Sequence, residues 1–381
     1  MRVPAVSARS LDTGQNARYN EEKITKTKAG KNTVKKHIAH ILLPAALFAA
    51  FLPLLLSVAG CRTDSAPKSR TVFGYFDTGA TFYDYSGADD ATADARFTLA
   101  QSLLERYHRY YDIYNEYDGL VNAATLNRRA GELLTVEEDL FDLLSYAKGK
   151  YAETEGKVNI AMGAVLSLWH DARENAEKDP ENATRPTPDA LAEAGAHCDI
   201  DDLILDRQTL TVRLADPQMR LDLGAVAKGY ATEKIAQELL SAGVTSFALD
   251  IGGNLRILGT KPDGTGFVTG VRNPDTSSSD RYVYTATLSD TALSTSGAYE
   301  RVFTAGGVRY GHIIDPATCE PPRLYASVTV VTPSAADADV YSTALFCTER
   351  AGIDRFVAAH PEVFLVIVYD DGTAETLGNR P

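Results

Sequence analysis

An aspartate and a threonine stand four residues apart in the segment Ala338–Thr343. If a helix begins near Ala335, the side chains of Asp339 and Thr343 lie one turn apart on the same face. A carboxylate and a hydroxyl are two hard oxygen ligands, which suits Mg²⁺ when water and phosphate complete its octahedron. The alternative is that acidic residues at a helix N-terminus only complement the helix dipole, which explains Asp337 better than Asp339.

A lysine lies between two glycines at the expected start of another helix, in the segment Asp222–Tyr230. Gly224 and Gly229 free the backbone to approach an anion, which the ammonium of Lys228 and the positive end of the helix would attract. The pattern is not a Walker A motif, because GxxxxGK(S/T) is absent. The alternative is a turn eased by glycine, with Lys228 on the surface.

Two further segments place polar residues where a strand meets a loop. His312 precedes Asp315, and an imidazole that titrates near neutral pH can act as a general acid or base. A purely structural histidine is the alternative. The segment Asp250–Asn254 follows an apolar strand, and its two adjacent glycines allow either a close approach to a ligand or simply a tight turn.

The charge balance limits the partners. The chain has 381 residues with 38 Lys and Arg against 51 Asp and Glu, and a formal net charge of −13. Only three of the acidic residues but nine of the basic ones fall within residues 1–60, so the remainder is strongly acidic. Binding to the phosphate backbone of nucleic acids is therefore not expected. A polyanionic substrate would need a metal ion to offset the acidic field.

The N-terminal 60 residues are typical of a secretory signal. A lysine-rich segment, Lys23–Lys36, precedes Ile41–Gly60, which contains no charged residue. The stretch ends in the letters LSVAGC, which resemble the lipobox of bacterial lipoproteins. Cys61 is therefore expected to be lipidated and to hold the chain on the extracytoplasmic face of the cell membrane. A transmembrane helix is the alternative, since twenty apolar residues can span a bilayer.

Three cysteines follow the lipobox, at positions 198, 319 and 347. Their odd number and wide spacing argue against a disulfide framework or a zinc site. One pair can form in an oxidising compartment, but the sequence does not say which pair.

Residues 61–70 are expected to form a polar tether and residues 71–381 the globular domain. Aromatic and β-branched residues predict a strand over Thr71–Tyr85. Apolar and aromatic side chains recur every three or four positions from Phe97 to Tyr114, which predicts an amphipathic helix. The polar segment Asp171–Pro188 is expected to be a loop.

A second helix is expected after Thr135, which forms a capping box with Glu138. From there strand-like and helical patterns alternate, without an internal repeat or a clean βαβ series. The fold class is therefore predicted to be α+β or mixed α/β. The predicted strands and helices of this part are Leu203–Leu205, Thr211–Leu214, Lys228–Ala242, Ser246–Ile251 and a helix from about Ala335.

Seven collinear segments resemble the ApbE-like flavin transferase family, whose members are FAD:protein FMN transferases and usually lipoproteins. The resemblance runs from about Tyr75 past the Asp339 helix and implies a T-fold-related catalytic domain with mixed, largely antiparallel sheets and flanking helices. The segments are AMGAVLSLW (Ala161–Trp169), DLGAVAKGYA (Asp222–Ala231), LDIGGNLRILG (Leu249–Gly259), LSTSGAYER (Leu293–Arg301), RYGHIIDPAT (Arg309–Thr318), SVTVV (Ser327–Val331) and ADVYSTALF (Ala338–Phe346).

The resemblance also implies roles for individual residues. Asp339 and Thr343 would bind Mg²⁺ with their side chains, and Ala225 with its backbone carbonyl. His312 would be the acid or base, with Asp339 as the alternative proton acceptor. The residues implied to contact FAD are Tyr114, Ala161, Met162, Gly163, Asp222, Lys228 and Ile313.

The chain departs from the family pattern at three places that bear on the site. Phe76 stands where many members have methionine near the cofactor. Cys319 stands where the family often has glycine, after His312. Ala336 occupies a place where some members have a further acidic metal ligand, for which Asp337 or water is expected to substitute.

The implied reaction is Mg²⁺-dependent transfer of FMN from FAD to a Ser or Thr hydroxyl of an extracytoplasmic flavoprotein, with release of AMP. The acceptor motif is (Ser/Thr)-Gly-Ala-(Ser/Thr). Hydrolysis of FAD to FMN and AMP is one alternative, and a non-catalytic FAD-binding lipoprotein is another. Residues 77–81 of this chain, DTGAT, resemble the acceptor motif but are expected to lie unreactive in a strand.

Overall fold

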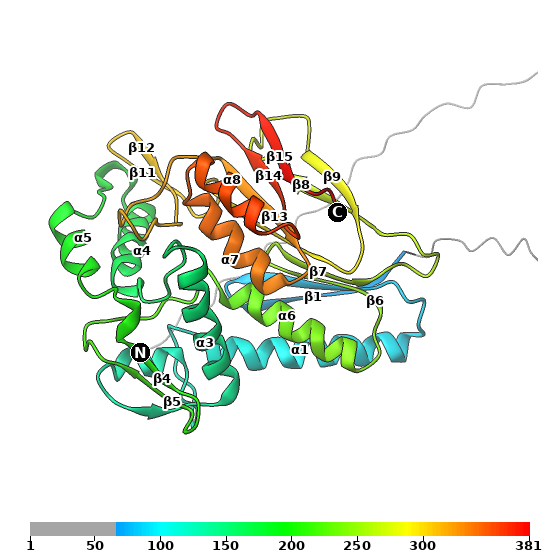
Figure 1. Cartoon of the computed structure of the whole chain (residues 1–381), viewed down its shortest axis with the longest axis horizontal. Coiled ribbons are helices and arrows are strands. Elements are labelled where there is room, and N and C mark those ends of the chain that lie inside the picture. The colour runs from blue at the N-terminus through cyan, green and yellow to red at the C-terminus, as the bar shows by residue number, and fades with distance from the viewer. Residues whose placement is uncertain (1–65) are drawn as a thin grey trace, which may run out of the picture. The chain divides into compact units, whose positions relative to one another are not determined.

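A computed structural model of the chain describes residues 66–381 (Figure 1). The predicted signal, the lipobox and Cys61 lie outside these residues. Between residues 66 and 381, no helix combines the length and apolarity needed to cross a membrane.

The centre of the described part is a sheet of eight strands in which each neighbouring pair is antiparallel. The inner strand β13 is buried along its whole length, because its β-branched side chains are covered on both faces of the sheet. In spatial order the strands are β1 (Lys68–Tyr75), β2 (Thr78–Asp84), β6 (Ser246–Ile251), β7 (Asn254–Gly259), β10 (Ala292–Gly297), β13 (Ser327–Thr332), β14 (Phe364–Val368) and β15 (Ala374–Gly378).

Three long helices cover one face of this sheet: α1 (Asp90–Tyr111), α6 (Ala227–Ser241) and α7 (Ala335–Phe346). In Figure 1, α1 and α6 run side by side below the sheet, with α7 above them. All residues of α7 are buried except Asp337 and Thr343, so this helix lies inside the core.

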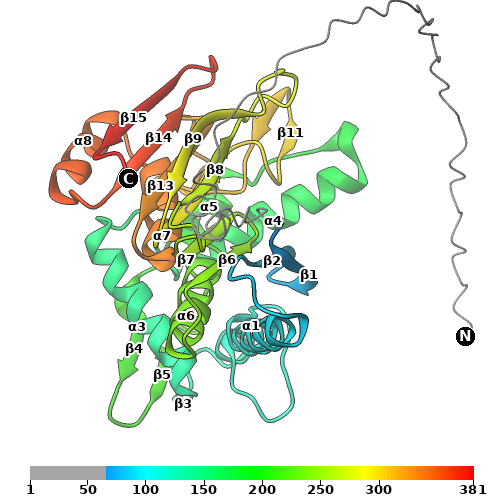
Figure 2. The ribbon, with the colours of Figure 1, turned by 90° about the vertical axis from the view of Figure 1, so that its right-hand side faces the viewer.

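A two-stranded hairpin covers the opposite face. Strands β8 (Phe267–Arg272) and β9 (Tyr282–Leu288) pair with each other (Figure 2). Their side chains Phe267 and Leu288 pack against residues of the sheet. The sheet is thus buried on both sides, by helices on one and by this hairpin on the other.

A third region packs around the single tryptophan, Trp169. Helix α4 (Gly163–Lys178), helix α5 (Pro188–Gly195) and the hairpin of β11 (Phe303–Ala305) and β12 (Val308–Tyr310) share this smaller core. The other described elements are α2 (Ala123–Arg128), β3 (Leu134–Thr135), α3 (Glu138–Glu153), the short 3₁₀ turns Pro180–Asn182 and Ile200–Asp202, β4 (Leu203–Asp206), β5 (Thr211–Leu214) and α8 (Arg350–Ala359).

The mixed α+β class and the largely antiparallel sheet are confirmed, and α6 and β6 fall where the sequence predicts them. The prediction of one strand over Thr71–Tyr85 is wrong. The chain turns at Phe76 and Asp77, both with positive φ, and β1 returns as β2. Neither residue is the glycine or asparagine that usually marks such a turn.

The tether is shorter than predicted. Strand β1 begins at Lys68, and Arg70 pairs with Phe82 in β2 while its guanidinium binds the Asp94 carboxylate. Residues 68–70 therefore belong to the folded domain, although their polarity indicates a linker.

Two local predictions also fail. Helix α4 continues to Lys178, through half of the segment predicted as a loop, because its polar residues pair along the helix, as in His170 with Glu174. Helix α3 does begin at Glu138, but its N-cap is Glu137 and no side chain caps it, so the capping box is absent.

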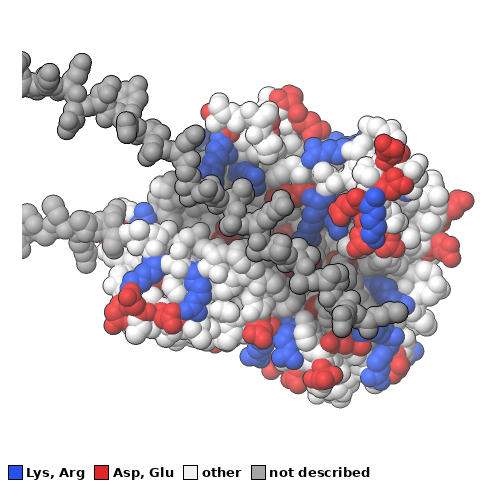
Figure 3. All heavy atoms as spheres, turned by 180° about the vertical axis from the view of Figure 1, so that it is seen from behind, with Lys and Arg blue, Asp and Glu red and all other residues white. Residues whose placement is uncertain are grey.

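Acidic and basic side chains are interspersed on the face of the molecule seen in Figure 3, between uncharged areas.

Candidate functional site

Helices α6 and α7 touch at Gly229 and Asp339. The Gly229 N–H donates to Oδ2 of Asp339 over 2.8 Å. A Cβ at Gly229 would lie 2.3 Å from Cβ of Asp339 and 2.5 Å from the carbonyl oxygen of Ala335. Only glycine permits this approach, which places a carboxylate at the first turn of α6.

One backbone carbonyl just before α6 has no hydrogen-bond partner in the described structure. Val226 is the N-cap of α6, so the Gly229 N–H is one of the first-turn donors that have no acceptor within the helix. Asp339 supplies that acceptor, and no hydrogen bond within residues 66–381 ends on the Ala225 carbonyl. The carbonyl oxygen of Ala225, which the resemblance implies as a metal ligand, is therefore available four positions before Gly229.

The Asp339 carboxylate is buried, with 5% of the residue exposed, and makes no ion pair in the described structure. Burial raises the pKa of Asp339, while the charge of Lys228 and the Gly229 amide act to lower it. Ser294 donates to Oδ1 over 3.4 Å, and the Asn254 side chain also favours the ionised form. Oδ1 of Asn254 is itself buried without a hydrogen-bond partner.

Thr343 follows one turn later on α7, as predicted. Its Oγ1 lies 3.1 Å from the Ser296 hydroxyl, which is also 3.0 Å from the Ser342 hydroxyl. Ser294 and Ser296 alternate along β10 and so face α7 together. The period of two in the letters LSTSG was the available signal for these two residues.

The donor set suits a hard divalent cation. Carboxylate, hydroxyl and carbonyl oxygens are the ligands Mg²⁺ takes, usually with one or two carboxylates and the substrate's phosphates. Residues 66–381 hold no group of three His, Cys, Asp or Glu side chains placed for a metal. A cation beside Asp339 would therefore depend on Thr343, the Ala225 carbonyl and oxygens of its ligand.

Asp337 does not supply the additional acidic ligand. Its Oδ1 accepts from the Tyr146 hydroxyl over 2.8 Å and lies 2.8 Å from Nζ of Lys150. Both partners belong to α3, so Asp337 fastens α7 to α3. The expectation that Asp337 replaces the missing acidic ligand is wrong, because Asp337 and Asp339 are two positions apart on a helix and therefore point to different sides.

The segment Ala161–Gly163, for which the resemblance implies contact with the nucleotide, lies side by side with the Asp222 segment. The Asp222 N–H donates to the Ile160 carbonyl over 2.8 Å, and the Gly163 N–H donates to that of Arg220 over 2.9 Å. A Cβ on Gly163 would lie 2.5 Å from the Arg220 carbonyl oxygen, so glycine is required there too. Ala161 and Met162, between these contacts, are buried.

Asp222 and Lys228 are joined by the Gly224 turn. Oδ1 of Asp222 accepts the Gly224 N–H over 2.8 Å, and burial raises the pKa of Asp222 against the opposing charge of Lys228. Nζ of Lys228 donates only to the Gly224 carbonyl, over 3.3 Å, and forms no ion pair within residues 66–381. Its charge is therefore free to meet an anion.

His312 is positioned by a backbone carbonyl. Its Nδ1 lies 3.1 Å from the carbonyl oxygen of Glu300, an acceptor, so Nδ1 carries the proton and Nε2 keeps its lone pair. Burial, helped by the charge of Arg301, lowers the pKa of His312 to about 4. The imidazole is consequently neutral at pH 7 and can accept a proton at Nε2. The neighbouring Ile313 is half-buried against the main core.

Tyr114 lies just beyond the end of α1 and is 55% exposed. Its ring centroid is 6.1 Å from that of His170 on α4, and its pKa is raised by burial and by the nearby charge of Asp222. Arg173 and Arg301 also act electrostatically on His312. The sequence did not single out His170, Arg173 or Arg301, because ordinary helix and loop residues carry no spacing signal.

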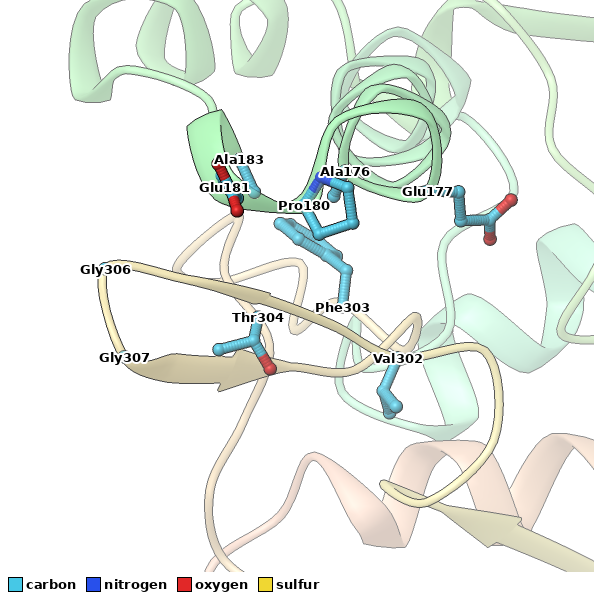
Figure 4. A pocket seen from close by; sticks show the side chains of 10 residues that line it. All are labelled: Ala176, Glu177, Pro180, Glu181, Ala183, Val302, Phe303, Thr304, Gly306 and Gly307. Carbon is cyan, nitrogen blue, oxygen red and sulfur yellow. The ribbon is translucent and has the colours of Figure 1, made fainter.

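Two open cavities in the described part of the chain lie near α4 and α5, and one of them includes the predicted site residue Met162. One, of about 550 Å³, lies between the end of α4 and the β11–β12 hairpin, where Phe303 faces Pro180 (Figure 4). None of the predicted site residues lines it. The other, of about 520 Å³, includes Met162, Cys198 and Cys319 in its wall.

The ApbE family model matches residues 79–367 of the chain. The FAD:protein FMN transferase of Treponema pallidum is 36% identical over 263 residues, which cover 65% of this chain and 70% of that one. The Haemophilus influenzae protein of the same name is 27% identical over 323 residues, covering 84% and 92%. The solved structure of the ApbE protein from Thermotoga maritima superposes with a TM-score of 0.70 at 27% identity, covering 81% of this chain and 96% of that one.

Proposed function

The chain belongs to the ApbE family, and from this premise we propose that it is an FAD:protein FMN transferase. It would transfer FMN from FAD to a Ser or Thr hydroxyl of a partner flavoprotein and release AMP. The acceptor oxygen forms a bond to the FMN phosphorus, and the bond from that phosphorus to the bridging oxygen breaks. The hydroxyl loses its proton as its oxygen attacks, and AMP leaves with the bridging oxygen on its own phosphate.

One observation carries the proposal: the buried Asp339 carboxylate accepts the Gly229 N–H at the start of α6, while no hydrogen bond within residues 66–381 ends on the nearby Ala225 carbonyl. Within residues 66–381 the buried Asp339 carboxylate makes no ion pair, the Ala225 carbonyl accepts no hydrogen bond, and Thr343 follows Asp339 one turn later on α7. These groups would hold Mg²⁺, which when bound neutralises phosphate oxygens and stabilises the charge that develops during transfer.

The remaining residues position the substrate and move the proton. Lys228, at the start of α6, would pair with the diphosphate. Nε2 of His312 would accept the hydroxyl proton, since the imidazole is neutral and oriented by Glu300. Tyr114, Asp222, Ile313 and the segment Ala161–Gly163 would line the flavin nucleotide.

We also propose that residues 1–60 are a secretory signal and that a lipid on Cys61 anchors the chain at the extracytoplasmic face of the cell membrane. The partner would then be an extracytoplasmic flavoprotein with the (Ser/Thr)-Gly-Ala-(Ser/Thr) motif. Labelling with a radioactive fatty acid, lost in Cys61→Ser, tests the anchor.

The chain's own DTGAT segment is a poor acceptor. Thr81 lies within β2, paired on both sides with β1 and β6, and its Oγ1 is 3.0 Å from that of Thr71. The motif would have to leave the sheet to reach a nucleotide.

Incubation of the purified protein with FAD, Mg²⁺ and an acceptor domain that carries the motif tests the activity. Covalent flavin fluorescence on the acceptor, lost with EDTA, is the expected result. Free FMN without labelled acceptor would instead identify a pyrophosphatase, and unchanged FAD would identify a binding protein; either result would overturn the proposal.

A further inference from the structure

Two of the three cysteines that follow the lipobox border the same cavity. Cys198, just after α5, and Cys319, in the loop after β12, are 121 positions apart in the sequence but both line the cavity of about 520 Å³. Both are partly exposed, whereas Cys347 at the end of α7 is buried. An oxidant from solvent can therefore reach the first two but not the third.

The two sulfur atoms lie against one helical turn. Sγ of Cys319 is 3.3 Å from the place where a Cβ on Gly195 would be. Cys198 stands one turn after Gly195, and its N–H donates to the Gly195 carbonyl over 3.3 Å while its Sγ donates to that of Ala194 over 3.4 Å. Residues three positions apart on a helical turn share a face, so Cys198 flanks the spot that Cys319 occupies.

The electrostatic interaction between Cys198 and Cys319 also indicates that the two side chains lie close together. Burial raises the pKa of Cys198 to about 11, and the next largest cause is the charge that Cys319 would carry. Burial likewise raises the pKa of Cys319.

The backbone of Cys319 is unusual for cysteine. Its φ is +57°, in the left-handed region that favours glycine. A side chain at this position therefore works against the local conformation.

We propose that Cys198 and Cys319 are a modification site at which a disulfide forms. The oxidant is a small-molecule or protein disulfide, and the reaction is thiol–disulfide exchange. One cysteine thiolate attacks the oxidant and releases its first thiolate. The second cysteine then attacks the mixed disulfide and releases the other, so the oxidant is reduced to two thiols that take the two protons.

The disulfide between Cys198 and Cys319 would connect two separate segments of the proposed site. The Cys198 carbonyl accepts from Nδ2 of Asn159 over 2.8 Å, and Oδ1 of Asn159 accepts the Ala161 N–H over 2.9 Å. The Cys319 N–H donates to the carbonyl of Asp315, over 2.8 Å, in the loop that follows His312. A cross-link therefore ties the nucleotide-lining segment to the His312 loop.

Peptide mapping tests the proposal without any assay of activity. The purified protein is treated with oxidised glutathione at pH 9, alkylated and digested without reduction. We expect one linked peptide pair containing Cys198 and Cys319, formed more slowly at pH 7 because both thiols are then protonated. We also expect a rise of several degrees in Tm that dithiothreitol reverses, because the bond closes a long loop.

Cys198→Ser and Cys319→Ser should each abolish the linked pair and the rise in Tm, while Cys347→Ser should leave both unchanged. Recovery of Cys198 and Cys319 only as separate alkylated or glutathionylated peptides would overturn the proposal, as would linkage to Cys347. The inference uses the proposed extracytoplasmic location only as a source of oxidant. The map therefore distinguishes its failure from failure of the transferase proposal.

Discussion

The two halves of the candidate site are built differently. Asp339 lies at the contact of two buried helices, so close that a single Cβ on Gly229 would not fit. His312 lies in an irregular stretch between β12 and β13, where its orientation depends on one carbonyl of another loop. The half proposed to hold the metal is therefore set by rigid packing, and the half proposed to accept the proton by a few loop hydrogen bonds.

The difference predicts unequal responses to substitution. A change at the helix contact should affect both the reaction and the free energy of unfolding, whereas a change in the loop should affect mainly the reaction and its pH dependence.

The largest loss is expected for Asp339→Asn. The amide keeps an oxygen for the Gly229 N–H but removes the charge that would hold the cation, so transfer should fall by on the order of 10³-fold. Rates measured with fluorescent acceptor across a Mg²⁺ titration check this. Thr343→Ser, which retains the hydroxyl, should keep most of the activity. A normal rate for Asp339→Asn in the presence of EDTA would remove the metal from the mechanism.

His312→Ala should lower the rate by roughly 10²-fold, the usual contribution of a general base. Because the pKa of His312 is about 4, the base is neutral above that pH and protonated below it. The wild-type rate should therefore be level from pH 6 to 8 and fall as the pH drops toward 4. The rate of His312→Ala should not show this fall at acid pH. If the fall is unchanged in the variant, it is caused by protonation of another group.

Gly229→Ala should reduce stability by about 1–3 kcal/mol, because the added methyl overpacks the contact with Asp339. Gly149→Ala is the matched control: Gly149 is exposed in α3 with nothing near its Cβ position, so it should gain roughly 0.5–1 kcal/mol. Urea unfolding measures both. Equal effects of the two substitutions would contradict the tight helix contact.

The smallest effect is expected for Arg301→Ala. The charge of Arg301 helps burial to lower the pKa of His312, so its removal should move the acid limb to higher pH. The rate at pH 7 should change by a few-fold at most, and the urea midpoint should not move. A large loss of stability would show that this loop is as rigid as the helix contact.

The same contrast explains what could be predicted from sequence. Helical spacing fixes where Asp339 and Thr343 lie relative to each other, so their predicted position one turn apart on a helix is confirmed. The fold class follows equally from alternation of strand and helix patterns. No pattern announces that Gly229 donates to Asp339, because that contact joins residues 110 positions apart.

Loop contacts were the least predictable. The acceptor for His312 is a backbone carbonyl, which all residue types share, so nothing in the sequence marks Glu300. The turn at Phe76 and Asp77 was missed for a related reason, since Phe76 adopts a positive φ although an aromatic residue gives no turn signal. The prediction for Asp337 was wrong because the sequence does not show that Asp337 forms an ion pair with Lys150 on α3.

The order of strands in the large sheet has a practical consequence. Its outermost strands, β1 and β15, are the first and last strands of the described chain. Seven interstrand spacings of about 4.8 Å separate them, or roughly 34 Å across the sheet. A circular permutant would thus need a connecting peptide of at least about ten residues. A reporter protein fused after β15 would sit at the border of the sheet opposite β1.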